Sequence, residues 1–174
     1  MPITIDRLRE SFSEGGAREI YQEVKAGGDF VGFARQYVFH EESRVARSAL
    51  WGLTKASDKE LAVLQVMLNE LIEQAMGTES SSVRRLTLNI IERLEMTEED
   101  LRTDFLDFCL EHFVARDEQP GIQTLCMKLA RRMCAFYPEL MGEFMRTLEA
   151  MEISDYTVAV RGLRNKMLRG DNNK

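Results

Sequence analysis

The sequence predicts an all-α protein that is built of about four to five antiparallel helix pairs. Residues that favour helices, such as Leu, Met, Glu, Arg and Ala, dominate the chain of 174 residues, and the apolar ones recur at spacings of three and four. Val, Ile and Thr are scattered and do not alternate as they would in strands. The chain has only three prolines, and Pro2, Pro120 and Pro138 each lie where a helix can begin.

Polar breaks between the apolar stretches predict about ten helices. Their expected ranges are 4–14, 17–26, 29–40, 43–56, 58–76, 80–95, 97–114, 119–136, 138–152 and 155–169. Ser57, Thr97 and Ser154 precede acidic turns and are expected to cap helix N-termini, where side-chain oxygens accept hydrogen bonds from free N–H groups. Gly15-Gly16 and Gly27-Gly28 are expected to end helices, because glycine adopts the left-handed conformation without strain.

The second helix of each expected pair repeats along the chain. Residues 45–53 align with residues 83–91 at an offset of 38, and a further offset of 39 brings Val83 onto Ile122. A looser match, 36 residues later, reaches Val158. A period of 36 to 39 residues with two helices per unit is in the size range of helical solenoid repeats.

Two segments carry a resemblance to a known family. Ser43-Arg44-Val45-Ala46-Arg47-Ser48-Ala49-Leu50 and Ser81-Ser82-Val83-Arg84-Arg85-Leu86-Thr87-Leu88 resemble the second helix of HEAT repeats. The family pattern favours a Val-Arg pair at the start of that helix and an acidic residue about five positions earlier. Here only Val83-Arg84 supplies the pair and only Asp117, ahead of Ile122, supplies the acid, so the other units depart from the pattern. An irregular helical bundle is the alternative interpretation.

The resemblance covers residues 29–169 and implies an α-α superhelix, a right-handed HEAT-like solenoid. We therefore expect a single solenoid domain over residues 1–169, in which residues 1–28 form a degenerate N-terminal cap. Residues 170–174 are expected to form a polar C-terminal tail. In a HEAT-like solenoid the first helices form the convex layer and the second helices line the concave layer.

The charges differ between these two layers. The net charge of −6 by itself argues against a nucleic-acid partner. Yet basic residues outnumber acidic ones in the second helices (43–56, 80–95, 119–136 and 155–169), while acidic residues dominate the first helices (58–76, 97–114 and 138–152). The pattern predicts an acidic convex face and a basic concave groove. The alternative is that the layers neutralise each other through exposed ion pairs, each worth roughly 0–1 kcal/mol.

One row of side chains is the candidate binding site. The apolar stripe of helix 43–56 leaves Arg44, Arg47, Trp51 and Lys55 on the opposite side, where the indole would lie between cations. The repeat offsets extend this row into the later units. The predicted site residues are Arg44, Arg47, Trp51, Arg85, Asn89, Lys128, Arg131, Arg132 and Arg164. Cations beside an indole can hold an anionic partner. Alternatively, Trp51 packs against a neighbouring repeat or an N-terminal helix.

The sequence offers little support for catalysis. His40 and His112 have no neighbours at the spacings of a metal site or a nucleophile, so we predict no catalytic residue, no metal and no cofactor. Ten methionines and three cysteines are expected to fill the core. On the second helices, the predicted core positions are Val45, Leu50, Leu53, Leu86, Ile90, Leu94, Leu125, Leu129, Met133 and Leu163. Odd, unpaired cysteines and the lack of a leader or a membrane span predict a cytoplasmic protein.

These features favour a non-enzymatic scaffold or adaptor whose basic concave face holds an acidic protein or another anionic partner. A DNA-binding protein or a DNA glycosylase of the HEAT-like repeat type is the alternative, since Trp51 with Arg44 and Arg47 is similar to the basic, tryptophan-containing face of those enzymes. No acidic residue can be assigned to the catalytic role, so whether the chain is an enzyme stays open. A third hypothesis is a subunit of a larger assembly or of a homo-oligomer.

Overall fold

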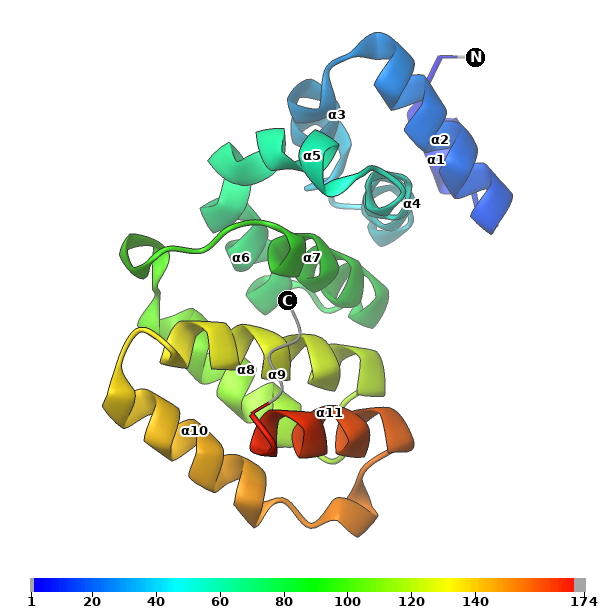
Figure 1. The fold of residues 1–174 in the computed structure, drawn as a ribbon. Coiled ribbons are helices and arrows are strands. Elements are labelled where there is room, and N and C mark those ends of the chain that lie inside the picture. The colour runs from blue at the N-terminus through cyan, green and yellow to red at the C-terminus, as the bar shows by residue number, and fades with distance from the viewer. Residues whose placement is uncertain (1, 171–174) are drawn as a thin grey trace. The chain divides into compact units, whose positions relative to one another are not determined.

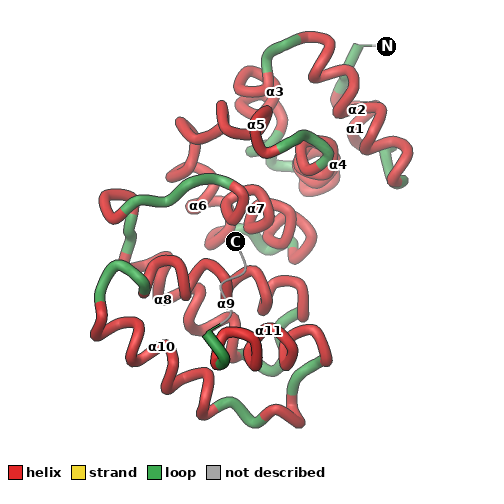
Figure 2. The backbone as a smooth tube through the Cα atoms, in the orientation of Figure 1, coloured by secondary structure: helices red, strands yellow, loops and turns green. Residues whose placement is uncertain are grey.

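A computed structural model describes residues 2–170, and all regular secondary structure in that part of the chain is helical (Figures 1 and 2). The all-α fold with helices packed in pairs, predicted from the sequence, is therefore confirmed. The chain divides into two compact units, residues 1–95 and 96–174, which are described separately. The prediction of one continuous domain over residues 1–169 stays a prediction. Of the expected polar tail, residues 171–174 lie outside the described part of the chain.

The N-terminal unit packs its helices around α4. Its elements are α1 (Ile5–Arg9), α2 (Glu14–Gly27), α3 (Phe30–Tyr37), α4 (Ser43–Thr54), α5 (Asp58–Leu61), the 3-10 helix η1 (Ala62–Met67), α6 (Leu68–Gly77) and α7 (Ser81–Arg93). Helix α4 contacts α1, α2, α3 and α7, while α6 pairs with α7. Gly52 allows the close approach of α2, because a Cβ there would lie 2.6 Å from Cγ2 of Ile20. Helix α4 is thus the buried centre of this unit.

The helix ends of this unit agree with the predicted chemistry at some positions and differ at others. Ser57 caps α5 and forms a capping box with Glu60, as expected. Gly28 ends α2 with φ of 72°, in the left-handed region. The prediction that Gly15-Gly16 end a helix is wrong, because both lie in the first turn of α2. Ser13 caps that turn by accepting a hydrogen bond from the N–H of Gly16.

The single helix predicted over residues 58–76 is also wrong, because the structure divides it into α5, η1 and α6. The buried residues Leu61, Leu64 and Met67 follow one another at intervals of three, which matches the three residues per turn of a 3-10 helix. The same spacing leaves Val63 and Val66 exposed on the outer side. Burial of the three-residue stripe therefore favours the tighter helix in the middle of this segment.

The C-terminal unit begins after Glu95. Its elements are the 3-10 helix η2 (Glu98–Asp100), α8 (Thr103–Val114), α9 (Pro120–Cys134), α10 (Pro138–Ala150), the 3-10 helix η3 (Ile153–Asp155) and α11 (Val158–Leu168). Helices α9 and α10 begin at prolines, as predicted. The predicted helix start at Ser154 is wrong, because Ser154 lies inside η3 and Thr157 caps α11 by accepting from the N–H of Val160.

The predicted core is confirmed for the second helices at all but one position. Nine of the ten predicted residues are buried, and the exception is Leu163, which is half-buried. In α11 the buried positions are instead Val160 and Met167, seven residues or about two turns apart. Cys109, Cys126 and Cys134 are buried thiols of the C-terminal unit, in the core positions expected of them.

Candidate functional site

The predicted row on α4 packs largely against the chain between α1 and α2. Nη2 of Arg47 donates to the carbonyl oxygen of Ser11 at 3.1 Å, and its guanidinium lies 5.2 Å from the ring centre of Phe12. Lys55 forms an ion pair with Glu14. Trp51 is half-buried. Arg47 and Lys55 are engaged within the chain and are therefore not the open cations that were expected beside Trp51.

Glu14 is the acidic residue that faces this row. The hydrogen bond from Lys55 holds the pKa of its carboxyl below the ordinary value, and the positive charges of Lys55 and Arg18 and a hydrogen bond from Trp51 act in the same direction. Because residues 11–14 supply both an anion and a carbonyl group, Arg47, Trp51 and Lys55 contribute to attaching this segment to α4. Arg44, which is exposed, lies outside this contact.

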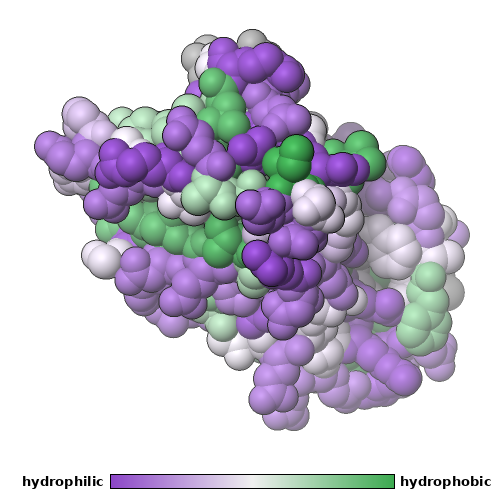
Figure 3. Space-filling model, turned by 90° about the horizontal axis from the view of Figure 1, so that it is seen from below, coloured by the Kyte–Doolittle hydropathy of each residue, from purple (hydrophilic) through white to green (hydrophobic). Residues whose placement is uncertain are grey.

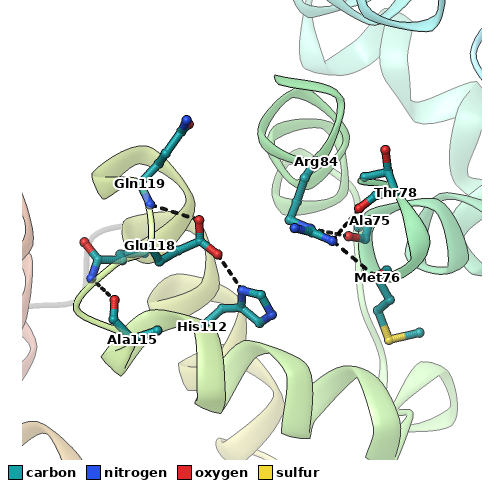
Figure 4. Close-up of polar contacts among 9 residues, drawn as sticks. Ala75, Met76, Thr78, Arg84, His112, Ala115, Glu118 and Gln119 are labelled. Carbon is teal, nitrogen blue, oxygen red and sulfur yellow. Dashed lines mark hydrogen bonds and ion pairs between the residues drawn. The ribbon is translucent and has the colours of Figure 1, made fainter. Parts of the chain in front are cut away.

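The adjacent arginines of α7 have different environments, and Figure 4 shows that of Arg84. The guanidinium of Arg84 is half-buried and donates to three carbonyl oxygens at the C-terminal end of α6, those of Ala75 at 2.8 Å, Met76 at 3.3 Å and Thr78 at 2.6 Å. These are carbonyl groups that a helix end leaves without internal partners. The Val-Arg pair of the repeat pattern thus joins the second helix of a pair to the end of the first.

Arg85 lies on the other side of α7 and is exposed. It makes no hydrogen bond or ion pair with another residue that the structure describes. Asn89, one turn later, is half-buried. Three predicted site residues of the N-terminal unit lie outside the contact with residues 11–14. They are Arg44, Arg85 and Asn89.

Other basic residues of the second helices also bind helix ends. Arg93 of α7 donates to the carbonyl groups of Thr54 and Ala56 and pairs with Asp58 at 2.7 Å. Arg164 of α11, a predicted site residue, donates through Nε to the carbonyl oxygen of Leu148 at 2.7 Å. Because Arg164 binds the end of α10, it has a structural role, which the repeat offset alone did not indicate.

In the C-terminal unit, Lys128 is exposed and makes no hydrogen bond or ion pair with another described residue. Arg131 and Arg132 are half-buried and engaged with other groups. Of the four predicted site residues of this unit, Lys128 is therefore the one that matches the expected open cation.

A contact that the sequence did not indicate lies at the end of α8. Nδ1 of His112 is 2.6 Å from Oε2 of Glu118 (Figure 4). The imidazole stacks on Phe108, with ring centres 3.9 Å apart. Nε2 of Gln123 donates to the carbonyl oxygen of Ala115 at 2.7 Å, and the hydroxyl of Tyr156 donates to that of Val114, also at 2.7 Å. These contacts fix the loop between α8 and α9 and give His112 a structural environment.

Among the residues that the structure describes, no cluster of three or more His, Cys, Asp or Glu side chains could hold a metal ion. None of the helices in that part of the chain is both long and apolar enough to span a membrane.

Paired helices with recurring end contacts define a helical-repeat protein. The sequence profile of a HEAT repeat domain matches residues 4–170, which is nearly the whole chain, and this chain therefore belongs to the HEAT repeat family. The match includes α1 and α2, the region that we expected to be a degenerate cap. HEAT repeats typically form helical scaffolds for protein interactions. Comparisons with curated proteins and with solved structures found no match.

Proposed function

We propose that this protein is a non-enzymatic scaffold that binds an acidic protein partner through open cations of its second helices. The observation that carries the proposal is the contrast between Arg84 and Arg85. Arg84 is occupied by three carbonyl groups, whereas Arg85 is exposed and has no hydrogen bond or ion pair with a described residue. A fold that needs only one arginine at this helix start leaves the second one available for a ligand.

The chemistry of Arg85 suits a carboxylate. A guanidinium offers a planar set of N–H donors that can bind a carboxylate through two hydrogen bonds, and the Asn89 amide, one turn away, adds a donor and an acceptor. Arg44 on α4 supplies another open cation in the same unit, while Lys128 is a separate open cation of the C-terminal unit. The proposed site is therefore narrower than the row predicted from the sequence, because Arg47, Trp51 and Arg164 are used in packing.

The experiment is affinity capture from a lysate of the source organism, with and without nuclease. The immobilised proteins are the wild type, the variant Arg85→Glu and the control Lys59→Glu, which reverses an exposed charge on the first helix α5 of the same unit. We expect the wild type and the control to retain one protein in stoichiometric amounts after nuclease treatment. The Arg85→Glu variant is expected to retain at least about tenfold less of that protein, because a desolvated charge contact is worth about 1.4 kcal/mol or more.

Two results would contradict the proposal. If Arg85→Glu retains the partner as well as the wild type does, Arg85 is not part of the binding surface. If nuclease releases the captured material and retention falls steeply with salt, the partner is nucleic acid and the DNA-binding alternative is correct.

A further inference from the structure

The C-terminal unit contains an apolar groove between α8 and α10, with a volume of about 290 Å³. Each helix supplies two apolar residues, one turn apart, and the end of α9 supplies a thiol. The apolar lining consists of Leu110, Val114, Leu140, Phe144 and Cys134. The volume is roughly twice that of an engineered cavity of ~150 Å³ that binds benzene, so the groove has room for one or two large side chains.

The floor of the groove is buried and neutral. Phe144 and Cys134 are each 1% exposed, and the ring of Phe144 meets that of Phe113 on α8 edge to face, with centres 5.7 Å apart. This contact joins the two helices beneath the groove. Burial, together with the charge of Glu143, raises the pKa of the Cys134 thiol to about 11, so the floor carries no thiolate at neutral pH. An apolar ligand would therefore meet only uncharged groups there.

Acidic side chains border the groove on both helices. Glu111 and Glu143 lie among its lining residues, and Asp107 and Glu139 stand one turn before them on the same helices. All four are exposed, and none forms an ion pair with another described residue. The space-filling view shows apolar side chains that reach the surface in a band between hydrophilic ones (Figure 3). An apolar slot between two negative rows is complementary to a ligand that combines apolar and positive groups.

We propose that this groove binds a basic amphipathic helix of a partner protein. One or two apolar side chains of that helix enter between α8 and α10, and its Lys or Arg side chains meet the acidic rows of Asp107 and Glu111 and of Glu139 and Glu143. Apolar anchors at spacings of three and four residues are the way in which helices bind to grooves. The opposite charge distinguishes this surface from the Arg85 site, so the partner segment differs from the acidic one proposed above.

The test is fluorescence anisotropy of the full-length protein with two labelled helical peptides. In the first, leucines at positions i and i+4 are flanked by lysines; in the second, glutamates replace the lysines. We expect the lysine peptide to bind and the glutamate peptide to bind at least about tenfold more weakly. The double variant Glu111→Lys/Glu143→Lys is expected to lose at least about tenfold in affinity for the lysine peptide, since opposed charges become like charges.

Matched variants separate the parts of the proposal. Glu149→Lys makes a single substitution of the same kind at an exposed position of α10 outside the groove and is expected to bind as the wild type does. Thr147→Phe fills the groove without changing its charge and is expected to weaken binding. Arg85→Glu is expected to leave the affinity for the peptide unchanged, so a failure of the Arg85 site would not affect this result.

Three outcomes would overturn the proposal. These are equal affinity for the two peptides, unchanged affinity of the double variant, and unchanged affinity of Thr147→Phe. Sedimentation equilibrium adds a fourth: if the wild type is a dimer that the double variant dissociates, the occupant of the groove is a second copy of this chain.

Discussion

Replacing Arg84 by methionine removes a guanidinium but keeps an apolar stem of similar length. The carbonyl groups of Ala75, Met76 and Thr78 then lose the donors that now lie 2.6 to 3.3 Å away. A hydrogen bond from a charged donor contributes about 1.5–3 kcal/mol when it stands alone. The three bonds share one half-buried guanidinium, and water can reach part of the helix end, so they do not add in full. We expect Arg84→Met to lower the free energy of unfolding of the N-terminal unit by about 2–4 kcal/mol.

The assay is urea unfolding followed by tryptophan fluorescence. Trp51 is the only tryptophan of the chain and lies in the N-terminal unit, so its emission reports on that unit. The matched control is Arg85→Met, which removes the neighbouring charge from an exposed position and is expected to change the free energy by less than about 0.5 kcal/mol. If the two variants unfold within about 0.5 kcal/mol of each other, the end contact of Arg84 is not a source of stability and our reasoning is wrong.

Two further predictions concern protonation. The carboxyl groups of Glu14, Glu42 and Glu60 have pKa values below the ordinary 4.5, because of hydrogen bonds from Lys55, from Arg9 and from the backbone of Ser57 respectively. A lowered folded-state pKa gives stability that is present above the unfolded pKa and is lost as the pH falls through the folded value. The urea midpoint reported by Trp51 should thus be constant down to about pH 5 and fall below it, and a midpoint that is unchanged at about pH 3 would contradict the assignment. Cys134, with a pKa of about 11, should react slowly with iodoacetamide at neutral pH in the folded protein and faster as the pH rises. Mass spectrometry of the alkylated peptides measures the rate at which Cys134 reacts, with the urea-unfolded chain as the control. Equal rates for the folded and unfolded chains near neutral pH would contradict the burial of Cys134 in the floor of the groove.

The parts of the fold that follow from local chemistry could be predicted from the sequence. The prolines at the starts of α9 and α10 and the capping box at Ser57 depend on neighbouring residues alone, and the apolar stripes of the second helices depend on spacing. The 3-10 segment could not be predicted in this way. Leu61, Leu64 and Met67 at intervals of three also fit one face of an α-helix, so periodicity does not distinguish the two helices when the stripe is short.

The candidate site was harder to predict because it depends on contacts between distant residues. Helical spacing places Trp51 correctly on the side opposite the apolar stripe, but it does not reveal that residues 11–14, about forty positions earlier, cover that side. The sequence alone does not distinguish the roles of Arg84 and Arg85, because both are arginines at adjacent positions. Only the position of the α6 carbonyl groups makes one of them part of the fold and leaves the other open.

The contacts at the helix ends also bear on how such repeats diverge. Arg84 follows Val83, and Gln123 follows Ile122 at the equivalent position 39 residues later; both donate to carbonyl groups at the end of the preceding helix. What these two units share is therefore an N–H donor of sufficient reach, supplied by a guanidinium in one and an amide in the other. A repeat unit can then lose the arginine of the family pattern and still keep the hydrogen bond to the end of the preceding helix. A search that scores amide and guanidinium donors together at this position would recognise degenerate units that a search for arginine alone would miss.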